Sequence, residues 1–278
     1  MADLLDGTVA IVTGGGSGIG EALCLQMARR GARVVVADID GDNAKRVATA
    51  VADSGGRATA SRIDVSQEQD IRRLVEETAA VYGRIDYQFN NAGIAIGGDA
   101  RDLTLDQWRR VLDVDLYGVL YGTLAAYPIM VGQGFGHIVN TSSAGGLVPM
   151  PLNAPYCTAK HAVVGLSLSL RLEAADLGVK VSAVCPGYVR TPIFDTSVTV
   201  NLPRELASRP PGRIKWMEAA QAARVILDGV ARNQAVIAFP AYTRWARRAI
   251  CLFPRALDRA APRQVREVRS YRTVAGPK

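Results

Sequence analysis

The chain alternates between short β-branched runs and amphipathic stretches, and this alternation constrains its fold more than any other feature. Strand–helix alternation predicts an α/β fold that is doubly wound, with a mainly parallel sheet covered by helices on both faces. The seven expected strands are 8–13, 33–37, 57–63, 85–90, 136–141, 180–184 and 235–239. The expected helices lie near 18–30, 42–53, 67–82, 104–131, 155–177 and 217–232. Such sheets bind ligands at the carboxyl ends of their strands.

The length of 278 residues fits one large domain with an appendage. We expect a single domain over 1–240, followed by a basic C-terminal extension over 241–278. Within the domain, the segment 190–216 contains four prolines. A long connection of this kind in a compact domain typically covers a ligand site, so we expect a substrate excursion there.

Charge is distributed unevenly along the chain. Residues 241–278 carry a net charge of +8, so residues 1–240 have a net charge of only −1. Because nucleic-acid binding needs a basic surface, the nearly neutral body predicts no nucleic-acid partner.

The N-terminus and the cysteines bear on compartment and metal binding. No cationic stretch followed by an apolar run opens the chain, and no run approaches the roughly 18–20 apolar residues of a membrane span. The four cysteines are scattered without metal-ligand or redox spacing, and the chain has two histidines. These features predict a cytoplasmic protein with free thiols and no metal site.

A glycine-rich turn lies between the first expected strand and the first expected helix. Five of the seven residues from Gly14 to Gly20 are glycines. Glycine permits a tight turn and a close approach of the backbone to a pyrophosphate, and the helix N-terminus supplies free N–H groups. The pattern predicts a Rossmann-type dinucleotide site formed by Gly14, Ser17, Gly18, Ile19 and Gly20.

Asp38 ends the second expected strand, 18 residues after Gly20. That placement suits a carboxylate that accepts hydrogen bonds from the adenosine ribose hydroxyls. A 2′-phosphate would meet like charge there, and no Arg or Lys lies within the glycine turn or directly after Asp38. We therefore expect NAD as the cofactor, with NADP as the alternative.

Three further side chains predict the chemistry. Tyr156 and Lys160 are four residues apart, so on a helix they lie on one face. Ser143 lies 13 residues before Tyr156, and the neighbouring Ser142 is the alternative hydroxyl. Together with the glycine turn, the phenol, the ammonium group and the hydroxyl indicate a nicotinamide-dependent alcohol dehydrogenase or ketone reductase.

The phenol of Tyr156 is the candidate general base for alcohol oxidation and the candidate acid for ketone reduction. A cation about 4 Å away would bring a tyrosine pKa from about 10 down toward neutral pH, and Lys160 would supply it. Lys160 also belongs to the cofactor site, because its ammonium can hydrogen-bond the nicotinamide ribose next to Tyr156. Ser143 would orient the substrate oxygen.

These motifs, in this order, resemble those of the classical short-chain dehydrogenase/reductase family over roughly residues 7–240. The resemblance implies that Ser143, Tyr156 and Lys160 are catalytic. It also implies the remaining cofactor contacts, with Asp64 and Val65 at the adenine and Asn91 near the ribose. The Val189 backbone and the Thr191 hydroxyl would hold the carboxamide.

One position departs from the family pattern. The family usually has Asn in a Val-Asn-x-x-Gly context, where this chain reads Val-Asp-Leu-Tyr-Gly with Asp115 in the Asn position. The family residue presents a backbone carbonyl to a water beside the lysine. Asp115 keeps that carbonyl, so we count it as catalytic, while its charge leaves the proton relay, the rate and the pH optimum open.

The expected substrate is a small apolar secondary alcohol or ketone, because the loops around the site are mostly apolar. Those residues include Leu147, Val148, Met150, Ile193 and Phe194. A non-catalytic nucleotide-sensing or scaffold protein of the same fold is the alternative from a different functional class.

The extension begins with an amphipathic stretch at 241–253. Trp245, Leu252 and Phe253 share a face, opposite Arg244 and Arg247. We expect the apolar face to pack on the protein or on another subunit, with peripheral contact to an anionic membrane as the alternative. Family members commonly pair the helices equivalent to 104–131 and 155–177, so the resemblance implies a homo-oligomer, either a tetramer or a dimer.

Overall fold

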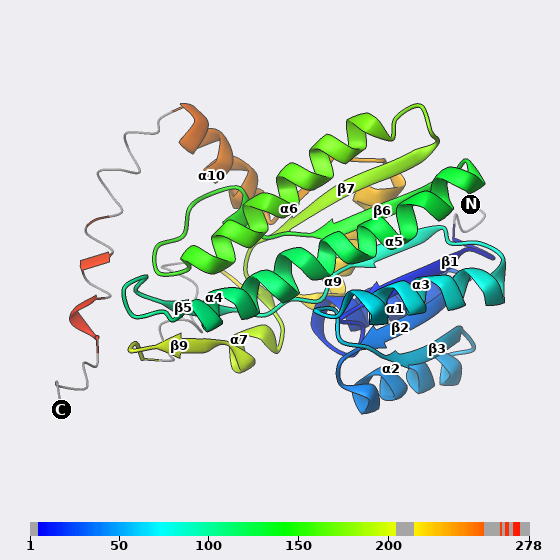
Figure 1. The fold of residues 1–278 in the computed structure, drawn as a ribbon, viewed down its shortest axis with the longest axis horizontal. Coiled ribbons are helices and arrows are strands. Elements are labelled where there is room, and N and C mark those ends of the chain that lie inside the picture. The colour runs from blue at the N-terminus through cyan, green and yellow to red at the C-terminus, as the bar shows by residue number, and fades with distance from the viewer. Residues whose placement is uncertain (1–4, 204–213, 253–261, 263–264, 267–268, 273–278) are drawn as a thin grey trace.

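The computed structural model describes residues 5–203, 214–252, 262, 265–266 and 269–272. Its central feature is a seven-stranded parallel sheet with the order β11-β7-β6-β4-β1-β2-β3 (Figure 1). The strands are β1 (Val9–Thr13), β2 (Arg33–Asp38), β3 (Arg57–Arg62), β4 (Tyr87–Asn90), β6 (Gly136–Thr141), β7 (Val179–Pro186) and β11 (Val236–Phe239). The predicted doubly wound Rossmann-type fold is confirmed.

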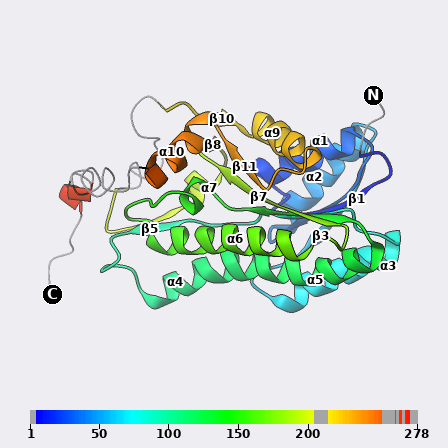
Figure 2. The same cartoon turned by 90° about the horizontal axis from the view of Figure 1, so that it is seen from above.

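Helices cover both faces of the sheet, as Figure 2 shows from above. One layer holds α1 (Gly18–Arg29), α2 (Gly41–Asp53) and α9 (Ala219–Ala231), and the other holds α3 (Glu68–Tyr82), α5 (Gly118–Gln133) and α6 (Ala154–Glu173). Successive residues of β1 point to opposite layers, since Ile11 belongs to one buried cluster and Val12 to the other. The continuously apolar strands are therefore buried on both faces.

The expected helix at 104–131 is interrupted. It consists of α4 (Leu105–Leu112), a π-helical turn (Asp113–Tyr117) and α5. By length and composition alone, the stretch Leu105–Gln133 could cross a membrane, which the sequence analysis did not expect. Inside the protein, 39% of its most apolar 18-residue segment is buried. Gly, Thr and Tyr residues interrupt its apolar runs, which is why no continuous run stands out in the sequence.

The described part of the excursion at 190–216 contains short elements. β8 (Val189–Arg190) pairs with β10 (Met217–Glu218), and β9 (Val198–Val200) pairs with β5 (Ile96–Gly98). A single helical turn, α7 (Ile193–Thr196), lies between β8 and β9. The excursion is thereby attached to the chain on both sides of the site, while residues 204–213 lie outside the described part.

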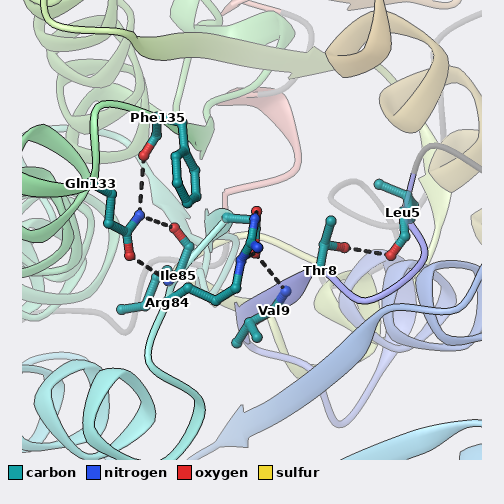
Figure 3. A network of polar contacts seen from close by, with 8 residues as sticks. Leu5, Thr8, Val9, Arg84, Ile85, Gln133 and Phe135 are labelled. Carbon is teal, nitrogen blue, oxygen red and sulfur yellow. Dashed lines mark hydrogen bonds and ion pairs between the residues drawn. The ribbon is translucent and has the colours of Figure 1, made fainter.

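The amino ends of the strands are joined by a polar network that the sequence does not reveal (Figure 3). The Asp86 carboxylate accepts hydrogen bonds from the Val9 backbone N–H at 2.9 Å and from Arg84 Nε at 2.8 Å. The Gln133 amide bonds both the N–H and the C=O of Ile85, at 2.8 and 2.9 Å. These contacts fasten β1, the start of β4 and the end of α5 to one another.

The helix α10 (Ala241–Leu252) is attached by its first turn. The Tyr242 hydroxyl accepts a hydrogen bond from the Tyr188 N–H at 2.8 Å, and Thr243 is buried. Trp245 and Leu252 are 65% and 71% exposed, so they do not pack on their own chain as one part of the expectation had it, and packing against another subunit stays a prediction. The physical reason is that the anchoring contacts come from the residues that precede this apolar stripe. Phe253 lies outside the described residues.

Two arginines near the C-terminus contact the body of the protein. Arg269 Nε lies 2.7 Å from Asp99 Oδ2, and Arg272 Nε lies 2.7 Å from Asp102 Oδ2. The arginine beside each carboxyl lowers the pKa of both acids. The acids belong to the connection between β5 and α4, so this part of the basic extension contacts the same edge of the molecule as the excursion.

Candidate active site

The sequence-predicted site residues lie at the carboxyl ends of the strands. Gly14, Ser17, Gly18, Ile19 and Gly20 follow β1, and Asp38 closes β2. Asp64 and Val65 follow β3, Asn91 follows β4, Ser143 follows β6, and Val189 and Thr191 follow β7. Tyr156 and Lys160 are carried to the same edge by α6, and Asp115 by the π-helical turn.

Backbone angles and close contacts explain why the turn between β1 and α1 contains glycine. Gly14 and Gly18 have φ angles of +63° and +55°, a backbone region that favours glycine. A Cβ on Gly20 would lie 2.0 Å from the Gly14 carbonyl oxygen, and one on Gly18 would lie 3.0 Å from the Thr191 side chain. The turn is therefore tightly closed, and the loop after β7 lies directly against it.

Asp38 is oriented by backbone donors at the end of β2. Its carboxylate accepts hydrogen bonds from Gly16 N–H at 2.9 Å and from Asp40 N–H at 3.0 Å. The guanidinium of Arg46, on α2, donates to the Gly16 carbonyl at 2.8 Å and forms an ion pair with Glu21 at 2.8 Å. A cation thus lies beside the turn after all, although 30 residues separate it from Gly16 in the sequence.

The other predicted cofactor residues differ in how they are held. The Asn91 amide donates to the carbonyl of Thr13 at 3.1 Å, and its backbone N–H donates to the Thr13 hydroxyl at 3.0 Å. The Asp64 carboxylate accepts hydrogen bonds from the Ser66 N–H and hydroxyl, and Val65 faces Gly118 at the start of α5. Thr13 begins the motif that resembles the family's cofactor turn, but the contacts of its hydroxyl and carbonyl with Asn91 were not predicted.

Lys160 is buried, with its side chain 3% exposed, and it is held from two directions. Its ammonium donates to the Thr141 carbonyl at 3.2 Å and lies 3.2 Å from Asp115 Oδ2. The hydroxyl of Ser142 donates to the Lys160 carbonyl at 2.7 Å, so this serine has a structural contact inside the protein. That leaves Ser143 as the hydroxyl beside the phenol.

Tyr156 is partly exposed beside this lysine, whose Nζ lies 5.6 Å from the ring centroid. Burial raises the pKa of the Tyr156 phenol, the Asp115 carboxylate raises it further, and the Ser143 hydroxyl opposes the rise. The direction is opposite to the sequence expectation. That expectation counted the cation of Lys160 but neither the burial of the phenol nor the buried carboxylate of Asp115.

Asp115 reaches this cluster through its side chain as well as its backbone. Its side chain is fully buried, and Oδ1 accepts a hydrogen bond from the Ile94 N–H at 2.8 Å. A π-helical turn is uncommon and frequently marks a functional site. A Cβ on Gly93 would lie 3.4 Å from both Asp115 Oδ1 and Lys160 Nζ, so Gly93 leaves room for the pair.

The residues at the carboxyl edge of the sheet fit a dinucleotide. The β1–α1 turn has no room for side chains at Gly18 and Gly20, the Asp38 carboxylate stands at the end of the neighbouring strand, and Thr191 lies over the turn. These are the features that a pyrophosphate and a ribose require at a strand–helix junction.

Comparison with known proteins supports the same conclusion. The family model described as short chain dehydrogenase matches residues 8–200. The chain belongs to the short-chain dehydrogenase family. Over 196 residues it is 37% identical to cyclohexanol dehydrogenase of Acinetobacter sp. strain SE19, covering 70% of this chain and 78% of that protein.

Two further similarities extend the match. The chain is 36% identical over 216 residues to meso-2,3-butanediol dehydrogenase of Serratia marcescens, which covers 78% of this chain and 83% of the relative. A short-chain dehydrogenase/reductase from Burkholderia phymatum, solved in complex with NAD, superposes with a TM-score of 0.81 at 29% identity. That structural match covers 91% of this chain and 95% of the other.

In this short-chain dehydrogenase, three aromatic side chains between β7 and β10 form a cluster. Trp216 meets Phe194 edge-on with centroids 4.7 Å apart, and Tyr188 stacks on Phe194 at 5.9 Å. Leu147, by contrast, packs against the buried cluster around Val164, so it contributes to the core. Trp216 was not predicted, and its only sequence signal is a single large aromatic residue at the end of the excursion.

Proposed function

We propose that this short-chain dehydrogenase is an NAD-dependent oxidoreductase that transfers a hydride between nicotinamide and an apolar secondary alcohol or ketone. The observation that carries the proposal is the convergence of Ser143, Tyr156 and Lys160 at the strand edge that also holds the glycine turn. The loop bearing Thr191 touches Gly18, which joins the two halves of the site.

The chain's own residues would hold the cofactor in three places. The backbone of the Gly14–Gly20 turn suits the pyrophosphate, Asp38 suits the adenosine ribose, and the Val189–Thr191 loop suits the carboxamide. When bound, NAD supplies the hydride exchange, and the protein has to position the carbinol carbon and move one proton.

Tyr156 would carry that proton. In ketone reduction its hydroxyl donates to the substrate oxygen, and in alcohol oxidation the phenolate accepts the hydroxyl proton. Ser143 would orient the same oxygen, since its hydroxyl lies beside the phenol and is itself fixed by the Gly145 N–H at 3.1 Å. Lys160 would hydrogen-bond the nicotinamide ribose and would contribute a charge beside the phenol.

NAD is favoured over NADP by Asp38, because its carboxylate would repel a 2′-phosphate. The NADP alternative gains one observation, namely that Arg46, Lys45 and Arg62 lie near this strand end. However, Arg46 is neutralised by Glu21, and the shallow cleft containing Lys45 and Arg62 also contains Asp40 and Asp42. The local charge therefore offers no net attraction to a phosphate.

The substrate class follows from the aromatic and apolar lining. Tyr188, Phe194 and Trp216 offer flat apolar surfaces, and a cyclohexanol dehydrogenase is among the relatives. The test is kcat/KM for cyclohexanol, 2,3-butanediol and a primary alcohol with each cofactor. We expect NAD-dependent oxidation, best with the cyclic alcohol. Equal or better rates with NADP would contradict the cofactor assignment, and inactivity toward every secondary alcohol would contradict the substrate class.

We also propose that the chain forms a homo-oligomer through α5 and α6. Their outer faces expose large apolar side chains, with Leu124 59% and Leu172 78% exposed. Apolar surface of this kind on a soluble protein is usually covered by a partner. A mass of two or four chains by light scattering at micromolar concentration is expected, and a monomeric mass would reject the proposal.

A further inference from the structure

The buried ion pair of Asp115 and Lys160 has a defined geometry that separates it from the surface ion pairs of this protein. Ile94 fixes Asp115 Oδ1 by its N–H at 2.8 Å, which leaves Oδ2 directed at Lys160 Nζ, 3.2 Å away. Within the described part of the chain, Oδ2 meets no donor with hydrogen-bond geometry. The carboxylate therefore acts on Lys160 mainly through its charge.

The net charge of the Asp115–Lys160 pair determines how strongly the pair stabilises the phenolate form of Tyr156. Asp115 and Lys160 share one proton. Whether it resides on the amine, as in an ion pair, or on the carboxyl group, the pair has no net charge. With asparagine at 115 the same lysine would carry an uncompensated positive charge. A positive charge beside a phenol stabilises the phenolate, so a neutral pair removes that stabilisation.

The other groups that act on the Tyr156 phenol supply no positive charge in place of Lys160, although the Ser143 hydroxyl lowers the pKa of the phenol by hydrogen bonding. They are the Ser143 hydroxyl and the thiols of Cys157 and Cys185. Burial raises the pKa of both thiols, that of Cys185 to about 12, although a hydrogen bond with Ser142 and the charges of Arg247 on α10 and of Lys160 lower the pKa of Cys185. The thiols are consequently neutral near pH 7, and the local balance lies between Asp115 and Lys160.

We propose that Asp115 is a positioning residue that neutralises Lys160 and thereby keeps Tyr156 protonated around neutral pH. The proposal rests on the proposed function, because it concerns the proton that Tyr156 exchanges with substrate. It agrees with the raised pKa of Tyr156, which burial raises most and the Asp115 carboxylate raises further. Burial likewise raises the pKa of Asp115, against the influence of Lys160.

The consequence is a difference between the two directions of the reaction. Ketone reduction needs the phenol, so it would stay active over a broad range up to alkaline pH. Alcohol oxidation needs the phenolate, so its kcat/KM would rise with pH through the neutral range. The equilibrium of the reaction is unaffected, because a side chain of the catalyst changes only the rates.

The test compares Asp115→Asn with Asp113→Asn. Asp113 lies on the same π-helical turn but is exposed, so it provides a matched loss of one carboxylate. Tyrosinate formation is followed by ultraviolet titration of the cofactor-free protein, and each spectrum is corrected by the Tyr156→Phe variant in the same background. We expect the Tyr156 midpoint to fall by about one pH unit or more in Asp115→Asn and to stay unchanged in Asp113→Asn.

Kinetics provide the second readout. The acidic limb of kcat/KM for alcohol oxidation should move with the titration, so oxidation at pH 7 should rise by about tenfold when the midpoint falls by about one pH unit. An unchanged or higher Tyr156 midpoint in folded Asp115→Asn would overturn the proposal. Because the titration needs no substrate, it gives this answer even if the proposed alcohol oxidation is absent.

If Asp115→Asn does not fold, titration of the wild-type protein can still overturn the proposal. The proposal requires that Tyr156 in the cofactor-free protein ionises at or above the ordinary tyrosine value of about 10. A wild-type midpoint close to neutral pH would overturn it, because an uncompensated Lys160 would then be acting on the phenol.

Discussion

The two edges of the central sheet each contain a buried carboxylate paired with a cation, but the two pairs are satisfied to different degrees. At the amino edge, Asp86 accepts hydrogen bonds from Val9 N–H and from two nitrogens of Arg84. At the carboxyl edge, Asp115 accepts one hydrogen bond, from Ile94 N–H, and meets its cation through Oδ2 without hydrogen-bond geometry.

In the function that we propose, this contrast separates polar groups that stabilise the fold from polar groups that take part in the chemistry. The planar guanidinium of Arg84 matches a carboxylate with two parallel hydrogen bonds and has no accessible deprotonated form. Lys160 is a compact charge that can be shared, and its partner Asp115 is desolvated. The first pair is suited to joining strands, and the second to setting the protonation of a neighbour.

Replacing Lys160 with Met would have the largest effect, because it breaks the carboxyl-edge pair completely. Turnover should fall by about 10³-fold or more, since Tyr156 loses its neighbour and the ribose its donor. Stability should also fall, by about 3–5 kcal/mol, because Asp115 is left buried without its partner. Urea unfolding and steady-state kinetics measure the two losses.

The sign of the pH dependence in Lys160→Met follows from the raised pKa of Asp115. The folded state then favours the protonated acid, so it binds more protons than the unfolded chain above the ordinary aspartate value of about 3.9. The stability loss should therefore be smallest near pH 4 and should grow as the pH rises. A loss that is independent of pH would show that Asp115 is not the group left uncompensated.

At the amino edge, Asp86→Ala should cost stability and leave the chemistry intact. It removes the acceptor of Val9 N–H and of Arg84, and we expect a loss of about 2–3 kcal/mol in unfolding free energy. The control is Asp106→Ala, an exposed acid paired with Arg109, which should cost less than about 1 kcal/mol. A change in the pH profile of Asp86→Ala would remove the distinction between the two edges.

Asp38→Asn should change cofactor choice by an intermediate amount. The neutral amide accepts weaker hydrogen bonds from a ribose and no longer repels a 2′-phosphate, so the NAD-to-NADP ratio of kcat/KM should fall by about 10–100-fold. Asp42→Asn, an exposed acid on α2 paired with Lys45, should leave the ratio unchanged. A constant ratio in Asp38→Asn would show that another group selects the cofactor.

The smallest effect is expected for Arg272→Ala. Asp102 would lose its cationic partner on the connection between β5 and α4, next to the substrate excursion. Because the contact joins the C-terminal extension to this one connection, we expect only a few-fold rise in KM for the alcohol and no change in NAD affinity. Equal rises in KM for alcohol and for NAD would show that the contact stabilises the fold as a whole and does not act on the substrate side alone.

The sheet was largely predictable from the sequence, because buried parallel strands are continuously apolar and end in recognisable turns. The strand at 136–141 agrees with β6 residue for residue, and the others differ by one or two residues at their ends. The π-helical turn was not predictable, since a single extra residue in a helix leaves no periodic signal. The short pairs β5–β9 and β8–β10 are too brief to register as strands.

The sequence predicted which residues form the site, but it did not predict the electrostatic interactions between them. Spacing placed Tyr156 and Lys160 on one helical face, and the glycine turn identified the dinucleotide edge. The pairing of Asp115 with Lys160 joins residues 45 positions apart in the sequence, and only the packing of α6 against the π-helical turn brings them together. The direction of the Tyr156 pKa shift was therefore wrong at the level of sequence.

In the function that we propose, Tyr156 at the carboxyl edge transfers the proton, and its hydroxyl contributes little to stability. Tyr156→Phe tests this division of roles, because it removes one oxygen from a partly exposed ring. We predict that kcat for alcohol oxidation falls by about 10³-fold, while NAD affinity and the urea midpoint stay unchanged. Turnover within a few-fold of the wild-type value, in a protein that still binds NAD, would show that another group carries the proton.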